Sequence, residues 1–561
     1  MLDPTDSVVQ MRPLDEGADR GPVGPGAARA LVKTKEGYWR RDRFIPMSRW
    51  RTGAFFLSLL LCLAVIFSFS FMVPCPAPDL SLRSWNRTFQ EAATYEFLAL
   101  GDANGDGVLD VLFVLKGAEG SLCPAGLGTP CVFVSALTGT NGDSLWERPL
   151  APELHWAQCG LPTFGDSNTG CLLSHADRIT AIQQHSGEVI WEQPQPPDLN
   201  SRPPALKIPD LNGDGVNDLV LIGQSPVQTK LVILSGRSGD RIGSEVVLDS
   251  AEVFRHLLHT TAKGSHYVLF HKDCGLYAQA LWRIAAQALE GSEAGLVKDP
   301  MWEEKTSATS GQVQLYKSDS LRHVVAVERG SRSPHLLLVS EGAVELMHGD
   351  RLQPLWKVNT SGLDVSVADL YVTGLCVLSE PTLGHYNKDG VPDVIIEEDM
   401  GNCTKKVKIL DGTSGRVLWE VSLRFRPETP RPTAVSIAKS YSVFVFWGDW
   451  LSQTNSSDSE KEQFSYMLHP HYSNVLLEKS TVADDIIAFK VALMEMGRHA
   501  SYVMLTGPVG VGARGSVTLT KRQLKEDIPE SRVLRLGELA SEETDQEIKE
   551  AFIRLHMRKD T

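Results

Sequence analysis

The stretches SALTGTNGDSLWE (residues 135–147), TAIQQHSGEVIWE (180–192) and KILDGTSGRVLWE (408–420) share one repeated pattern. Each has a run of strand-forming residues, then a glycine turn, then a tryptophan four residues after the glycine. The stretch ILSGRSGDRIG (233–243) has the same turn without the tryptophan. Self-similar segments recurring along a chain are typical of repeat architectures.

The spacing of these segments predicts the fold. If Trp146, Trp191, Gly243, Trp302, Trp356, Trp419 and Leu477 are equivalent, they are separated by 45, 52, 59, 54, 63 and 58 residues. Steps of this size suit four-stranded propeller blades with loops of variable length. We therefore expect residues 95–525 to form an all-β, seven-bladed propeller, with eight blades as the alternative. The tryptophans would pack between neighbouring blades.

A short acidic loop occurs in two intact copies and one altered copy. Oxygen-bearing side chains stand at loop positions 1, 3, 5 and 9, a glycine stands at position 6, and position 7 would contribute its backbone carbonyl. In the first two copies these ligand positions are Asp102, Asn104, Asp106, Val108 and Asp110, and Asp210, Asn212, Asp214, Val216 and Asp218. Calcium prefers such sets of oxygen ligands, and the glycine permits the sharp turn that gathers them.

The third copy has His385, Asn387, Asp389 and Asp393 at positions 1, 3, 5 and 9. An imidazole at position 1 is a poor ligand for a hard cation, so we expect a degenerate loop there. None of the loops has the glutamate of an EF-hand at position 12, and strand-like residues flank all three. Each loop should therefore connect two strands of a hairpin, with structural Ca²⁺ in the first two.

Residues 52–73 contain no charge, proline or amide side chain, and they are long enough to span a bilayer as one helix. Lys33, Lys35, Arg40, Arg41 and Arg43 precede this stretch, which places the N-terminus in the cytosol by the positive-inside rule. We expect a type II signal-anchor in the lipid bilayer of the plasma membrane, reached through the secretory pathway. A cleaved signal peptide is the alternative, but some 50 residues precede the apolar stretch.

Modification sites agree with this orientation. The N-glycosylation sequons, all C-terminal to the apolar stretch, begin at Asn86, Asn359, Asn402 and Asn455. Eight cysteines also follow it, and Cys62 lies within it. Short spacings favour the disulfides Cys123–Cys131, Cys159–Cys171 and Cys376–Cys403, which leaves Cys75 with Cys274. The pairing itself cannot be derived from sequence.

Composition and charge complete the division of the chain. The net charge of −14 argues against a nucleic-acid partner. The expected parts are a disordered cytoplasmic tail (1–51), the anchor (52–73), a stalk (74–94), the propeller (95–525) and a C-terminal segment (526–561). In that last segment we expect an amphipathic helix with Ser541 as its N-cap and Ile548, Phe552 and Leu555 on one face. GVGARG at 510–515 matches a dinucleotide-binding pattern, but a strand follows it where a helix is required.

The D-x-N-x-D-G-x-x-D hairpins on a propeller repeat resemble the FG-GAP repeats of integrin alpha subunits. With one N-terminal span and a glycosylated ectodomain, the chain resembles the family of integrin-alpha FG-GAP repeat-containing single-pass membrane proteins. The resemblance implies a cell-surface propeller that holds calcium in outer-edge hairpins. Integrin function is not implied, because no leg region, C-terminal span or integrin cytoplasmic motif is present.

These features favour a cell-surface binding or scaffold module for an unidentified extracellular protein or glycan, with no catalytic residues assigned. The alternatives are a propeller enzyme, quinoprotein-like or hydrolytic, and an accessory subunit of another membrane protein. A quinoprotein would show a cofactor-lined central channel, and the hydrolase a separate zinc-binding domain. Neither is readable in the sequence.

Overall fold

The computed structural model describes residues 49–72 and 84–556 apart from a set of loops. The residues between these limits that lie outside the description are 118–130, 151–152, 163–168, 197–199, 225–227, 249–252, 254, 273–274, 292–294, 319, 331–332, 361–378, 402, 427–428, 438–440, 452–461, 483–484, 495–498, 509–513 and 538–542.

The first of two compact units covers Met1–Ala77 and contains helix α1 (Arg49–Met72). This helix forms over the stretch predicted to span a membrane. Within the part of the chain that the structure describes, however, no helix is both long enough and apolar enough to cross a membrane. The predicted transmembrane helix is therefore not confirmed.

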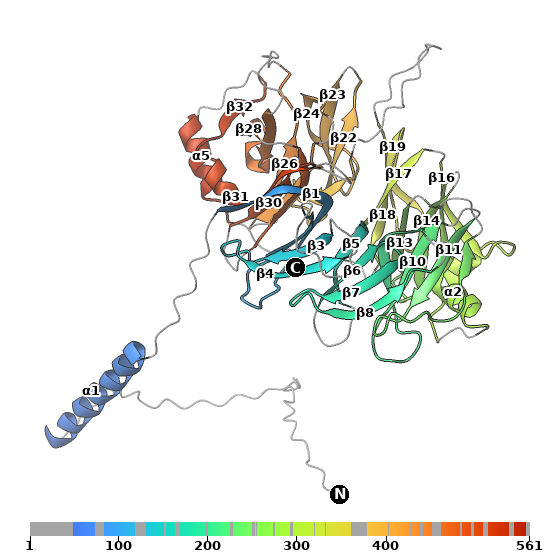
Figure 1. Cartoon of the computed structure of the whole chain (residues 1–561). Helices are drawn as coiled ribbons and strands as arrows, with labels where there is room; N and C mark the ends of the chain where they lie inside the picture. The colour runs from blue at the N-terminus through green and yellow to red at the C-terminus, as the bar shows by residue number, and fades with distance from the viewer. Residues whose placement is uncertain are drawn as a thin grey trace, which may run out of the picture. The chain divides into compact units, whose positions relative to one another are not determined.

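The second unit, Pro78–Thr561, is all-β and consists mainly of four-stranded antiparallel sheets (Figure 1). Two of them are β5 (Leu154–Leu161), β6 (Gly170–His175), β7 (Arg178–Gln183) and β8 (Val189–Pro194), and β9 (Asn200–Ile208), β10 (Asp218–Gln224), β11 (Thr229–Leu234) and β12 (Val246–Leu248). The next two are β13 (Arg255–Thr260), β14 (His266–Lys272), β15 (Gly275–Ala280) and β16 (Gln312–Lys317), and β17 (Leu321–Val327), β18 (His335–Ser340), β19 (Ala343–Met347) and β20 (Pro354–Asn359).

The sheets that follow along the chain keep this order. One consists of β21 (Thr382–Gly384), β22 (Asp393–Asp399), β23 (Thr404–Leu410) and β24 (Val417–Arg424). The next has a fifth strand at its edge and consists of β25 (Thr433–Ile437), β26 (Tyr441–Trp447), β27 (Glu462–Leu468), β28 (Val475–Val482) and β32 (Arg532–Arg535).

A seven-stranded sheet joins the two ends of the unit. It contains β29 (Ile486–Ala492), β30 (Ser501–Thr506), β31 (Gly515–Gln523), β1 (Trp85–Gly101), β2 (Asp110–Lys116), β3 (Val132–Leu137) and β4 (Ser144–Leu150). Strand β1 connects the two parts of this sheet, because its first part pairs with β31 and its second part pairs with β2. In Figure 1 the blue strand β1 accordingly lies beside the red strands β30 and β31.

The first strands of successive four-stranded groups contact one another, which gives the propeller its axis. Strand β1 contacts β5, β5 contacts β9, β9 contacts β13, and β13 contacts β17. Further along the chain, β21 contacts β25, β25 contacts β29, and β29 contacts β1. The second strand of each group is buried along most of its length and has a mainly apolar centre, as in β2, β6 and β18. Strands covered on both faces need such continuous apolar runs, which explains why these segments do not alternate.

The repeated tryptophans connect one sheet to the next. The indole N–H groups of Trp146, Trp191 and Trp356 donate to backbone carbonyls of the following turn, at 3.2, 2.9 and 2.9 Å. A Cβ on Gly187 would lie 2.5 Å from the Trp146 ring, so the turn must carry glycine where the ring packs. The predicted role of these tryptophans in packing between sheets is confirmed.

Trp302 is an exception to the predicted equivalence. It lies in helix α3 (Pro300–Glu304), which together with α2 (Leu281–Ala288) is inserted between β15 and β16. Its ring is fully buried and packs against His259 and Tyr267 of the β13–β16 sheet, with ring centroids 5.3 and 4.2 Å apart. The outer strand of this sheet is β16, which contains no tryptophan.

Strand pairing continues beyond the predicted boundaries at 94 and 525. Residues 85–94 belong to β1 and not to a stalk, because β31 needs a strand partner there. Beyond residue 525, β32 pairs with β28, and α5 (Asp545–Ile553) buries Ile548 and Phe552 against the sheet. The expected amphipathic helix is confirmed, but its N-cap is Thr544, while Ser541 lies outside the described residues. The short helices α4 (Leu524–Asp527) and η1 (Pro470–Tyr472) lie in the same region of the chain.

Candidate metal loops

Each of the three acidic loops connects two antiparallel strands, as predicted. They follow β1, β9 and β21, and the pairs Gly101–Asp110, Ile208–Asp218 and Gly384–Asp393 close the hairpins. The position-6 glycine has a positive φ in every copy: 81° at Gly107, 83° at Gly215 and 79° at Gly390. Residues with a Cβ rarely adopt this conformation, so the glycine is a requirement of the turn.

In the first loop the side-chain oxygens face the loop's own backbone. The Asp102 carboxylate accepts from the N–H groups of Gly105 and Gly107, at 2.7 and 3.0 Å. The Asn104 carbonyl accepts from Asp106 N–H at 3.0 Å, and the Asp106 carboxylate accepts from Val108 N–H at 2.7 Å. All of these bonds are exposed to solvent, which leaves the remaining oxygen lone pairs accessible.

The second loop repeats this pattern and adds a neighbour. Asp210 accepts from Gly213 and Gly215, both at 2.7 Å. Ser235 donates to Asp214 at 2.9 Å, and Arg237 donates to the Asp214 carbonyl at 2.9 Å. The sequence did not single out Arg237, although it lies in the glycine turn of residues 233–243, which is part of the repeated pattern.

The aspartate at position 9 differs from the other loop aspartates in its burial. Asp110, Asp218 and Asp393 are completely buried. Asp110 accepts from Ala103 N–H at 2.7 Å and from Gly139 N–H at 2.8 Å, so it joins its own loop to the turn after β3. Burial raises the pKa of this carboxyl, and the backbone hydrogen bonds only partly oppose the shift.

The equivalent aspartates make equivalent bonds. Asp218 accepts from Leu211 N–H at 2.7 Å and from Gly236 N–H at 3.3 Å. Asp393 accepts from Tyr386 N–H at 2.7 Å and from Gly412 N–H at 3.0 Å. Position 9 is therefore a buried structural link between turns, and its predicted role as a calcium ligand stays a prediction.

The third loop is tied to the neighbouring turn by side chains. Asn387 donates to Asp411 at 3.1 Å, and Thr413 donates to Asp389 at 2.7 Å. The buried Nδ1 atom of His385 has no hydrogen-bond partner among the described residues. These contacts link the third loop to the turn between β23 and β24.

Over the described ranges, no group of three or more histidine, cysteine, aspartate or glutamate side chains lies close enough together to hold a metal ion. Positions 1, 3 and 5 of the two intact loops still present exposed oxygens, a donor set that suits a hard cation.

The structure describes some of the predicted glycosylation sites and cysteines. Asn86 on β1 and Asn359 on β20 have exposed side chains, whereas Asn402 and Asn455 lie outside the described residues. The Cys159–Cys171 disulfide is confirmed and joins β5 to β6. Cys131 is disulfide-bonded to a cysteine outside the described residues.

The predicted Cys376–Cys403 bridge is not formed. Cys403 is a free, exposed thiol in a left-handed turn between β22 and β23, with φ of 57°. The proposed partner Cys376 lies outside the described residues, as do Cys75, Cys123 and Cys274.

Four-stranded sheets joined by tryptophans, with their first strands in contact around an axis, define this chain as an all-β propeller protein. Residues 85–558 match the model of the FAM234A/B beta-propeller family. The chain is 33% identical to Protein FAM234A of Rattus norvegicus over 576 residues, covering 100% of both chains. It therefore belongs to the FAM234A/B beta-propeller family.

The second branch of the family is more distant. Protein FAM234B of Mus musculus is 29% identical over 518 residues, covering 87% of this chain and 79% of that protein. Among solved structures, the exotype rhamnogalacturonan lyase YesX matches with a TM-score of 0.42 and 14% identity, over 77% of this chain and 72% of that one. This likeness is too distant to bear on function.

Proposed function

We propose that this chain is a type II cell-surface glycoprotein whose propeller is a binding or scaffold module for an extracellular protein or glycan. The main support is the position of the sequon residues Asn86 and Asn359, both exposed on strands at the outer edge of four-stranded groups. A glycosylated rim around a tightly packed body suits a rigid platform with its faces open to partners.

The anchor in this proposal is residues 52–73. Its support is their uncharged, apolar sequence and the basic residues that precede them. The described side chains of α1 are exposed, among them Phe55, Leu57 and Leu60. Such side chains need an apolar environment, and a bilayer would supply it.

For the platform itself we propose eight blades. Counting β1 twice, once with β29–β31 and once with β2–β4, leaves each four-stranded group as one blade. The ring would then be closed by a strand from the start of the propeller completing the last blade, which removes an exposed edge.

We further propose that the two intact loops bind structural Ca²⁺ through positions 1, 3 and 5 and the carbonyl at position 7, without the aspartate at position 9. In the full-length protein, CaCl2 should raise the melting temperature relative to EGTA. Asp106→Asn combined with Asp214→Asn should abolish that rise, because each change removes a charge at position 5. Asp389→Asn in the third loop is the matched control and should leave the rise unchanged. Absence of a rise in the wild type, or its persistence in the double variant, would exclude the site.

The binding role is tested on intact cells. A membrane-impermeant proximity label attached to the C-terminus should mark a reproducible surface protein or glycoprotein, and the same anchor without residues 78–561 should not. Labelling restricted to secretory-pathway proteins would instead contradict a surface role.

A further inference from the structure

A cavity of about 360 Å³ lies where several inner strands of the propeller begin. Its walls come from β9, β13 and β17 and from the segment before β21, with Arg255, His256 and Glu380 as its charged or titratable residues. The apolar part of the wall includes Leu257, Leu269 and Val324. Polar and apolar side chains both line this site, and its size suits a small molecule.

Arg255 provides a positive charge at the cavity wall. It is the exposed first residue of β13, and it makes no ion pair or side-chain hydrogen bond with any described residue. Two nearby imidazoles respond to its charge. Burial, and secondarily Arg255, lowers the pKa of His271 and lowers the pKa of His323 to about 4. These histidines are therefore neutral at physiological pH, and among the residues that line the cavity the positive charge comes from Arg255.

The acid that lines the cavity is already paired. Glu380 accepts a hydrogen bond from Arg431 at 2.7 Å. Its negative charge is therefore balanced by Arg431 and not by Arg255.

His256 fixes one wall of the cavity. Its Nε2 atom lies 2.7 Å from the Pro204 carbonyl. Because a carbonyl can only accept, Nε2 carries the hydrogen and Nδ1 is left as an acceptor in the neutral ring. Burial also lowers the pKa of His256, so this ring adds no positive charge.

We propose that this cavity binds a small organic carboxylate, with the carboxylate on the Arg255 guanidinium and the apolar body against Leu257 and Val324. A guanidinium matches a carboxylate through two parallel hydrogen bonds. A phosphate dianion would need further donors, and the neighbouring histidines are neutral. This inference goes beyond the proposed function and does not depend on where in the cell the chain resides.

Isothermal titration calorimetry of the full-length protein in nanodiscs tests the proposal, with 3-phenylpropionate as the probe and empty nanodiscs subtracted. We expect saturable binding of the carboxylate and none of its neutral amide, 3-phenylpropanamide. Arg255→Gln should weaken binding by about tenfold or more, the scale of one lost charged contact. Arg416→Gln, on the exposed turn between β23 and β24, is the matched control and should bind like the wild type.

The amide comparison uses unaltered protein, so it does not depend on how the variants fold. No saturable binding of the carboxylate, equal binding of acid and amide, or an Arg255→Gln affinity within twofold of the wild type would each overturn the proposal. A surface partner found on cells would leave this result unchanged, and the reverse also holds.

Discussion

At the scale of single residues, the buried aspartate at position 9 is the most consequential side chain of each acidic loop. Asp110 holds its loop and the turn after β3 through two charge-assisted hydrogen bonds, at 2.7 and 2.8 Å. Asp110→Asn replaces one accepting oxygen with an amide N–H that faces a backbone N–H. We expect the free energy of unfolding to fall by about 2 kcal/mol, the scale of a lost hydrogen bond to a buried charge. Urea denaturation measures it.

The same substitution on the exposed arm of the loop is the control. Asp106→Asn keeps an oxygen that can accept from Val108 N–H, and its site is solvated. In calcium-free buffer it should change stability by less than about 0.5 kcal/mol. If the two variants were equally stable, the buried link would not be the role of position 9.

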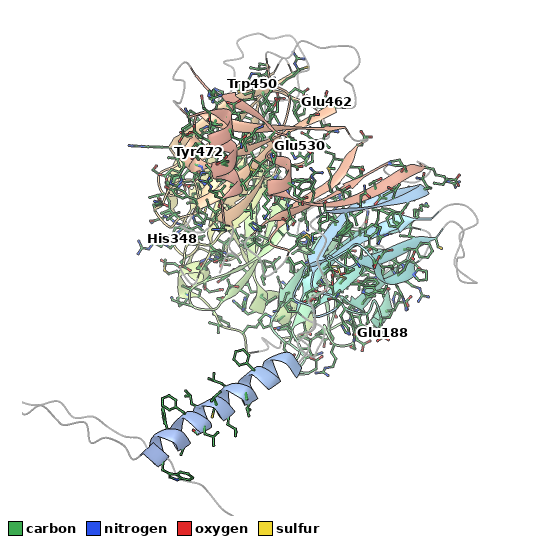
Figure 2. All side chains as sticks on the ribbon, turned by 90° about the vertical axis from the view of Figure 1, so that its left-hand side faces the viewer. Glu188, His348, Trp450, Glu462, Tyr472 and Glu530 are labelled. Atoms are coloured by element: carbon green, nitrogen blue, oxygen red, sulfur yellow. A yellow bond between two sulfur atoms is a disulfide. The ribbon has the colours of Figure 1, made fainter. Side chains whose placement is uncertain are left out.

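At the scale of elements, helix α5 packs on the propeller next to the buried side chain of His469. The ring of His469 lies 5.8 Å from that of Phe552, and Tyr472 lies beside the same helix, with its ring 5.6 Å from Phe552 (Figure 2). Burial, and secondarily His471, lowers the pKa of His469 from 6.5 to about 4. The unfolded chain therefore binds a proton more readily, and stability should fall as the pH drops from about 6.5 toward 4, by up to about 3 kcal/mol. Hydrogen exchange of the α5 amides across this range measures the change.

Two variants test whether His469 causes this pH dependence. His469→Asn can still accept from His471 N–H, as Nδ1 of His469 does at 3.0 Å, but it cannot titrate. It should flatten the pH dependence of exchange in α5. His185→Asn, at an exposed turn, should not. Unaltered pH dependence in the first variant would assign the effect to other buried histidines, such as His259.

At the scale of the whole molecule, the sequence predicted the repeat but not how its ends join. The glycine–tryptophan segments and the acidic loops are local, so their hairpins and packing could be inferred from spacing alone. The group formed by β29–β31 and β1 could not be inferred, because its outer strand precedes every repeat and its tryptophan, Trp85, lies outside the counted series. The inward turn of Asp110 and the cavity at Arg255 also depend on contacts between distant strands, which no local pattern records.

This joining of the ends leads to a prediction about truncation. Residues 85–92 pair with β31, the Trp85 indole donates to the Gly139 carbonyl at 3.1 Å, and Phe89 packs on Phe113 with 5.5 Å between rings. A chain beginning at residue 95 would lose all three contacts and leave β31 as an exposed edge prone to aggregation. We expect residues 78–561 to be secreted as a cooperatively unfolding monomer and residues 95–561 to be retained or aggregated. Trp85→Ala in the longer chain should cost about 3 kcal/mol, the scale for a buried tryptophan. Size-exclusion chromatography and thermal unfolding compare the oligomeric state and the stability of the two chains. A monomeric, equally stable 95–561 chain would show that the first part of β1 is dispensable.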